Sequence, residues 1–469
     1  MAGMSTEQSE FSVGQRVGFV MSAALTLFTS SVDGMRHLMD GAARTDGRRP
    51  AALEARARDL GRYTADQAGE AAISLCQGVI GTIKQDLENE GIEEPKGRHH
   101  PPAREQLGAL VAIANGPENT LRMGLEYWEK CGGNPEAAMY GLDYALWKTG
   151  PPASTKLATA LVPSLVSEFQ ELLGALYRQW LTMNPGAVGK KQTSMEDLLE
   201  YETKDDLLRR AIDERVHDIV DRVPEEWAER IKQDMGISVG ELCPDWEQIC
   251  EVFARRNAIV HAGGRVDDTY IMRTGSDLIV GEILNTDAEY FEASAGTFEA
   301  LGVRLTVLWF ARLTPEGPAP ANFAAPHIYT CLKSRDWEDA LVLATAVLRG
   351  REQSDLPDVV VVNWWMARRE SGEGVEGIRD EVIAWVPTAN EPGLELARTA
   401  LLLDVEGFRQ LLADPRIRSG LTPTVKEWPL VTRMFETSPE LRAFFPSSLD
   451  ARKAASRAAR PRKKGGKRR

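Results

Sequence analysis

Apolar side chains recur every three or four residues along most of the chain, and this is the period of an amphipathic helix. In the middle of the chain the period runs through residues 165–181, 205–223, 224–235, 245–262 and 288–311. One short apolar run, residues 278–284, interrupts these segments and is typical of a strand. The pattern therefore predicts an all-α protein with one short strand-like insertion.

Turn-forming residues divide the chain into segments. Asn134, Pro135 and Glu136 have the order of a helix start, within an N-terminal region that ends near position 160. Prolines and glycine at 315–320 mark a second boundary. The predicted organisation is a helical N-terminal region of unknown role (1–160), a middle domain (161–314), a helical-repeat-like domain (321–449) and a basic tail (450–469).

Residues 321–414 read as successive helix pairs. The expected pairs are 328–332 with 337–348, 359–369 with 375–386, and 393–403 with 406–412. Their spacing is typical of tetratricopeptide-like hairpins, although a plain helical bundle fits the pattern equally well. Either arrangement favours an interaction surface over a catalytic one, so we expect a protein partner to bind there.

The charge of the chain is unevenly distributed. The formal net charge is -13, from 56 basic and 69 acidic residues. Residues 451–469 hold ten of the basic residues and no acid, which leaves 46 basic and 69 acidic residues and a charge of -23 for the rest. An acidic body argues against a nucleic-acid platform over the whole surface and confines phosphate attraction to the predicted disordered tail.

Several other classes of protein are disfavoured. The five cysteines have no zinc-ligand spacing and are expected to be reduced thiols. His99 and His100 stand beside two prolines without a carboxylate or thiol at ligand spacing, so a solvated loop is expected. The apolar stretch 17–28 is shorter than the ~20 residues that span a bilayer. We therefore expect a cytoplasmic protein without a metal, a cofactor or a membrane contact.

The segment 245–262 departs from a simple amphipathic pattern. Its first half carries one apolar stripe, formed by Trp246, Ile249, Cys250 and Phe253. Continued along the helix, this stripe reaches Arg256, Asn257 and Val260, and two glycines at 263–264 then end the helix. A charge in a buried stripe costs several kcal/mol unless it is paired or opens onto a site. The pattern thus indicates a functional site, or else a helix end that turns toward solvent.

At these residues the chain resembles the HEPN ribonuclease family. Arg256, the polar Asn257 and His261 match its motif, in which an arginine, a following polar residue and a later histidine form the active site. The flanking Trp246 helix, the doubled arginine and the residues 263–270 are similar to the family as well, and residues 165–173 resemble its first helix. The resemblance covers roughly the middle third of the chain and implies a HEPN-type helical bundle.

Two other arginines also fit the spacing of the motif. Arg210 stands seven positions before His217 but is followed by alanine, so we treat this pair as an accidental match. Arg255 fits the spacing to His261, but Asn257 follows Arg256 directly and favours Arg256. Arg256 and His261 lie five positions apart, which places them about 140° apart around an ideal helix. Action on one phosphate therefore predicts a homodimer with two facing motifs.

The motif suits cleavage of RNA without a metal. There is no P-loop, no HExxH and no two-metal carboxylate set in the sequence. In the chemistry we expect, His261 acts as acid or base on the 2′-hydroxyl or the leaving oxygen, Arg256 clamps the phosphate, and Asn257 orients either group. The resemblance implies a toxin or antiviral defence setting. The alternative is a non-catalytic HEPN-like module for dimerisation or for binding protein or RNA.

Overall fold

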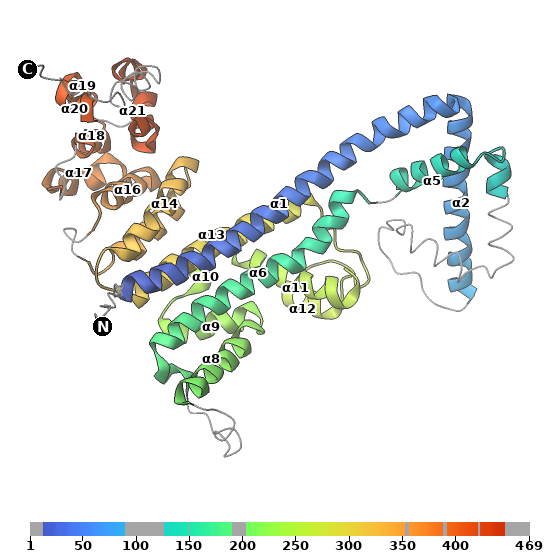
Figure 1. Ribbon diagram of the computed structural model, residues 1–469, viewed down its shortest axis with the longest axis horizontal. Coiled ribbons are helices and arrows are strands. Elements are labelled where there is room, and N and C mark those ends of the chain that lie inside the picture. The colour runs from blue at the N-terminus through green and yellow to red at the C-terminus, as the bar shows by residue number, and fades with distance from the viewer. Residues whose placement is uncertain are drawn as a thin grey trace, which may run out of the picture. The chain divides into compact units, whose positions relative to one another are not determined.

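The computed structural model describes residues 13–89, 126–149, 151–189, 203–351, 356–387, 392–420 and 423–445 (Figure 1). Every regular element within these ranges is helical, so the all-α prediction is confirmed for the described chain. The strand expected at 278–284 is wrong. Its only β pairing is an isolated bridge between Arg265 and Ile283, because the run lies beside the short 264–266 segment and has no longer partner. The predicted tail and the His99–His100 loop lie outside the described residues.

The chain divides into two compact units. The motif unit consists of residues 26–175 and 192–302, and the C-terminal unit of residues 1–25, 176–191 and 303–469. Helices α1 (Val13–Leu60), α6 (Ala153–Met183) and α13 (Ala288–Leu313) contribute residues to both. The domain boundary expected near position 160 thus lies inside α6, whereas the 315–320 segment covers the turn after α13 and the first two residues of α14.

The motif unit also contains a series of shorter helices. They are α2 (Arg62–Asn89), α5 (Pro135–Thr149), α8 (Lys204–Val220), α9 (Pro224–Met235), α10 (Val239–Leu242), α11 (Trp246–Ala262) and α12 (Asp268–Thr274). The ends of α8, α9 and α11 agree with the sequence expectation within a few residues. Helix α6 begins twelve positions earlier than 165, because its first turns carry small and polar residues rather than a full apolar stripe.

An aromatic cluster joins the helices of the motif unit. Phe169 of α6 lies at the centre, with ring centroids 6.0 Å from Phe28, 5.0 Å from Phe298 and 6.1 Å from Trp227. Trp227 of α9 continues the cluster to Trp246, the first residue of α11, at 5.4 Å. Buried aromatic rings contribute large apolar areas and prefer such edge-on or tilted contacts. This cluster fixes the beginning of α11, the helix that carries the motif.

Polar contacts fix two other helix starts in the motif unit. The Asn134 side chain accepts hydrogen bonds from the backbone N–H groups of Glu136 (2.9 Å) and Ala137 (3.4 Å), so the predicted cap of α5 is confirmed. Helix α6 is capped at long range, since the Asp46 carboxylate of α1 accepts from the N–H groups of Ala153 (2.8 Å) and Ser154 (2.9 Å). These bonds outweigh the effect of burial and lower the pKa of Asp46.

The C-terminal unit is built largely from consecutive helices. Its helices after α13 are α14 (Ala319–Ser334), α15 (Trp337–Leu348), α16 (Asp358–Arg368), α17 (Gly374–Ala384), α18 (Pro392–Leu401), α19 (Val405–Ala413), α20 (Pro415–Gly420) and α21 (Pro429–Thr437), with a π-helical turn, η3 (Arg369–Glu373), and the 3-10 turns η4 (Pro423–Glu427) and η5 (Pro439–Phe444). A further 3-10 turn, η1 (Pro185–Val188), follows α6. The helices expected in pairs at 328–412 are present. Buried Arg369 caps α18 by donating to the carbonyl oxygens of Ala400 (2.8 Å) and Leu401 (2.9 Å).

Helix α1 and the thiols bear on two further expectations. Residues 17–28 belong to the much longer α1, which by length and composition alone could cross a membrane, a test that core helices and signal sequences also pass. The four cysteines whose side chains the structure describes form no disulfide: Cys131 and Cys243 are buried, and Cys250 and Cys331 are half-buried. Within the described residues, no three histidines, cysteines or carboxylates gather in a group that could hold a metal ion.

Candidate functional site

Helix α11 carries the whole predicted motif in its last three turns. Asp245 occupies the N-cap position as expected, but its side chain makes no capping hydrogen bond. The other end follows the expected glycine termination: Gly263 is left-handed (φ 61°), and the N–H of Gly264 donates to the carbonyl oxygen of Ala258 at 3.0 Å. His261 therefore lies in the last turn, directly before the chain leaves the helix.

The buried face of α11 differs from the expected stripe. Its buried residues are Ile249, Val252, Phe253, Ala254, Arg255 and Ala258. Arg255 is only 9% exposed, Arg256 and Asn257 are half-buried, and Val260 is 51% exposed. The prediction that Arg256, Asn257 and Val260 continue the core-facing stripe is thus wrong. In the second half of α11 the buried positions are instead Ala254, Arg255 and Ala258, because Ala254 and Ala258 belong to a small apolar cluster with residues of and around α12.

Arg255 is held in a buried polar network. Its Nε donates to Glu251 at 2.8 Å, and its Nη1 donates to the carbonyl oxygen of Asn285 at 2.5 Å. The same Glu251 carboxylate accepts from the hydroxyl of Tyr270 (2.6 Å) and from that of Tyr290 (2.5 Å). The Arg255 guanidinium also lies 4.0 Å from the centre of the Tyr290 ring. One carboxylate thereby joins α11 to α12 and α13.

The titration of these groups agrees with a structural role for the network. Burial raises the pKa of Tyr270 and of Tyr290 above the usual tyrosine range, and Glu251 raises both further. Both phenols therefore stay protonated and donate to Glu251. Burial alone would lower the pKa of Arg255, but its neighbours Tyr290 and Glu251 outweigh this effect and raise it. Arg255 is thus a permanent cation whose charge is already neutralised.

The next residue, Arg256, lies in a different environment. Its Nη1 donates to Oδ1 of Asn257 at 3.0 Å, so the structure brings two of the three predicted site residues together. No carboxylate among the described residues pairs with Arg256, and its Nε atom is buried without a hydrogen-bond partner. A guanidinium that lacks a carboxylate partner keeps its remaining N–H groups for an anion, which it can bind in a bidentate manner.

His261 is exposed and forms no hydrogen bond with Arg256 or Asn257. No described residue forms a hydrogen bond or an ion pair with its imidazole ring, so neither nitrogen is committed to a neighbour. The other pair with the spacing of the motif, Arg210 and His217 on α8, is more constrained. Arg210 donates to Glu214 (2.8 Å), and His217 lies 3.1 Å from Asp221. These are surface pairs one helical turn apart, and they do not converge on a common site.

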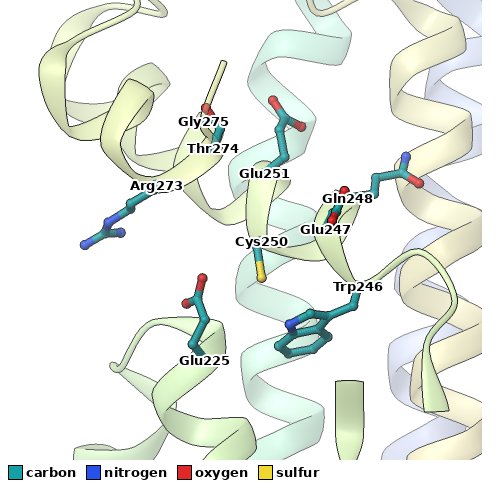
Figure 2. Close-up of a pocket in the computed structure, with 9 residues that line it drawn as sticks. All are labelled: Glu225, Trp246, Glu247, Gln248, Cys250, Glu251, Arg273, Thr274 and Gly275. Atoms are coloured by element: carbon teal, nitrogen blue, oxygen red, sulfur yellow. The ribbon is translucent and has the colours of Figure 1, made fainter. Parts of the chain in front are cut away.

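A cavity of about 690 Å³ lies beside the first half of α11 (Figure 2). Glu225, Glu247 and Arg273 contribute to its lining, together with Trp246 and the thiol of Cys250. Burial and the neighbouring Glu225 raise the pKa of Cys250 to about 12. This thiol therefore stays protonated near neutral pH and does not provide a thiolate nucleophile.

Sequence reasoning missed the Glu251 network completely. One local signal was present, because Glu251 and Arg255 have the i, i+4 spacing of an ion pair on a helix. The two tyrosines could not be found in this way, since they come from other helices 19 and 39 positions along the chain.

Comparison with protein-family models, with curated proteins and with solved structures finds no match to this chain.

Proposed function

We propose that the chain is a metal-independent endoribonuclease of HEPN type, with Arg256, Asn257 and His261 as its active-site residues. The observation that supports this proposal most strongly is the different environment of two adjacent arginines. Arg255 is neutralised by Glu251, whereas Arg256 has no carboxylate partner among the described residues and lies beside Asn257. A cation left without a counter-charge next to an amide suits the binding of a phosphodiester.

The reaction uses a nucleophile that RNA carries itself. His261 removes the proton of the 2′-hydroxyl or protonates the leaving 5′-oxygen, and water accepts or supplies the other proton. The 2′-oxygen attacks phosphorus, the bond to the 5′-oxygen breaks, and Arg256 balances the charge that develops on the phosphoryl oxygens. Asn257 holds the Arg256 guanidinium in place through the 3.0 Å hydrogen bond. The products are a 2′,3′-cyclic phosphate and a 5′-hydroxyl, and DNA is spared because it lacks the nucleophile.

The active species in this proposal is a homodimer, since one helix directs Arg256 and His261 about 140° apart. Exposed apolar side chains near the end of α11 support such pairing. They are Val260 (51% exposed) on α11, Met272 (78%) on α12, and Ile279 (55%) and Val280 (49%) in the following loop. Exposed apolar side chains on neighbouring elements are typical of surfaces that contact another protein. A two-fold axis here would bring the two motifs to one cleft.

The test is RNA cleavage by the purified full chain, with and without EDTA, on labelled transfer, ribosomal and single-stranded RNA. We expect cleavage in both conditions, and loss of nearly all of it in His261→Ala and Arg256→Ala. His217→Ala, which removes the other spaced histidine, is the matched control and should keep its activity. Substrates with 2′-deoxy nucleotides should not be cleaved.

Two outcomes would overturn the proposal. Full activity in His261→Ala or Arg256→Ala would contradict the assignment of the active-site residues. Cleavage that depends on an added metal would contradict the metal-independent mechanism. Binding of RNA or of a second chain without any cleavage would favour the alternative, a HEPN-like module for dimerisation or binding. The C-terminal helix pairs, with Ile383 (58% exposed) and Val386 (81%) on and after α17, would then be tested first for a protein partner.

A further inference from the structure

A second cavity, of about 480 Å³, lies in the part of the motif unit whose role the sequence does not indicate. The end of α1 and parts of α2 and α5 line it, with Tyr140, Tyr144 and Trp147 from α5. We call this cavity the aromatic pocket. Its volume falls within the roughly 300–1,000 Å³ of small-molecule sites in proteins.

The three rings form one wall of the aromatic pocket because they lie three and four positions apart on α5. Tyr140 and Tyr144 are stacked, with centroids 6.0 Å apart and planes 21° from parallel, and Trp147 follows at 5.8 Å. Tyr140 is buried, whereas Tyr144 and Trp147 are half-buried. Tyr144 also packs closely over Gly69 of α2, where an added Cβ atom would lie 2.8 Å from the ring. Packing thus accounts for Tyr140 and much of Tyr144, but leaves Trp147 partly open.

Three cations line the same pocket: Arg58 at the end of α1, Arg62 at the start of α2 and Lys148 on α5. Neither arginine forms an ion pair with any acid that the structure describes, whereas nearby Arg56 is paired with Asp143 at 3.1 Å. The Lys148 ammonium lies 5.8 Å from the Tyr144 ring centre and 5.6 Å from that of Trp147. Arg58 and Arg62 therefore carry positive charge that no ion pair with a described acid neutralises.

Two carboxylates, Glu54 and Asp66, complete the charged lining. Three cations and two acids leave the pocket with a formal charge of +1. An aromatic cage for a quaternary ammonium group would need the opposite balance, because cations repel such a ligand. Burial and Asp66 raise the pKa of Tyr140, so its hydroxyl stays protonated. Rings, free cations and carboxylate acceptors together match a flat heterocycle that carries an anion and exposes N–H groups.

We propose that the aromatic pocket binds a nucleotide unit. The base stacks on the wall at Trp147, its amino edge donates to a carboxylate, and its phosphate is held by Arg58, Arg62 and Lys148. A free nucleotide and a nucleotide within a single-stranded RNA share this chemistry. The proposal does not rest on the cleavage reaction above, since it concerns other residues and is measured as binding.

The experiment measures binding by the full chain in two arms, one with AMP and GMP and one with a short single-stranded RNA. The RNA carries 2′-O-methyl groups, so that it cannot be cleaved through its own hydroxyls. Saturable binding of the mononucleotides identifies a free nucleotide as the ligand, and binding of the oligonucleotide alone identifies an RNA strand. We expect the double variant Arg58→Glu/Arg62→Glu to weaken binding about tenfold or more and to flatten its salt dependence.

Trp147→Ala should weaken binding by roughly fivefold or more, and Trp147→Phe should restore most of it, because any aromatic face can stack. The matched control is Arg44→Glu, an exposed arginine of α1 outside the pocket, which should bind like the unmodified chain. Circular dichroism should be used to check that each variant is folded. If Trp147→Ala does not fold, the test relies on the Arg58→Glu/Arg62→Glu variant, whose arginines are exposed. The proposal is overturned if neither ligand binds at millimolar concentration, or if the Arg58→Glu/Arg62→Glu variant binds as tightly as the control.

Discussion

The adjacent arginines of α11 should respond in opposite ways to the same substitution. Arg255→Met removes a buried cation and leaves the Glu251 carboxylate with only the two tyrosine hydroxyls as donors. Arg256→Met removes a half-buried cation that has one side-chain hydrogen bond, to Asn257. Methionine retains the aliphatic part of either side chain, so the comparison isolates the guanidinium group.

The two variants should differ in the free energy of unfolding because the two arginines differ in burial. Removal of one partner from a buried ion pair costs about 3–5 kcal/mol, because the other charge stays buried without compensation. The Glu251 side chain is 22% exposed, so some water reaches it and the cost lies at the lower end of this range. We therefore expect Arg255→Met to lower the free energy of unfolding by ~3 kcal/mol. The expected cost of Arg256→Met is below ~1 kcal/mol, as for most partly exposed positions. Only the second variant should lose RNA cleavage while it keeps its stability.

Thermal melting of the full chain is the first assay. A cost of ~3 kcal/mol lowers the melting temperature by roughly 6–12 °C for a domain of this size. Because the chain has two units, hydrogen exchange of peptides from α11 and α12 should accompany it and report the local loss directly. Equal destabilisation by the two variants, or a fully stable Arg255→Met, would refute the assignment of Arg255 to the framework and Arg256 to the site.

Three further outcomes are expected. Folding raises the pKa values of Tyr270 and Tyr290, so the stability that their protonated hydroxyls contribute should be full below pH ~10 and should fall as the pH rises above it. In melting curves, a variant with both tyrosines replaced by phenylalanine should lose less stability over the same rise in pH. Deletion of residues 451–469, with ten cations, should weaken RNA binding at low salt and flatten its salt dependence, without a change in cleavage position; equal affinity at ~50 and 200 mM salt would contradict this. Specific activity should fall on dilution as light scattering shows dimers turning into monomers, and a fully active monomer would exclude the shared site.

The period of the apolar residues predicted α8, α9, α11 and the helices between 328 and 412, because each amphipathic helix buries one face whatever it packs against. It did not give the bounds of α1 and α2, and it did not predict α12. Helix α9 begins and ends at the expected residues, and Asn134 caps α5 as its residue type predicted. The prediction of a strand at 278–284 was wrong for a physical reason. A short apolar run cannot specify whether a neighbouring strand exists, and here the run meets only three residues of the 264–266 segment.

The candidate site was predictable only in part. Residue type and spacing singled out Arg256, Asn257 and His261, and the hydrogen bond between the first two is a local contact of the kind that sequence can suggest. Which arginine is buried could not be predicted, since a helical period fixes the buried face only to within about one position per turn. The decision depends on Tyr270 and Tyr290, whose approach to Glu251 is a property of the tertiary fold.

The geometry of α11 also limits how the proposed site can work. The Glu251 network fixes the third turn of the helix from the inside, so Arg256 and Asn257 start from a defined position at its edge. His261 has no such anchor and lies about 140° from Arg256 around the helix, whereas Asn257, four positions before His261, lies on the same flank. Val260 lies between the two directions and is 51% exposed. An apolar side chain between a phosphate clamp and an acid–base group does not serve a substrate bound to one chain, but it suits a contact with a second chain that brings its own His261 to the first chain's Arg256.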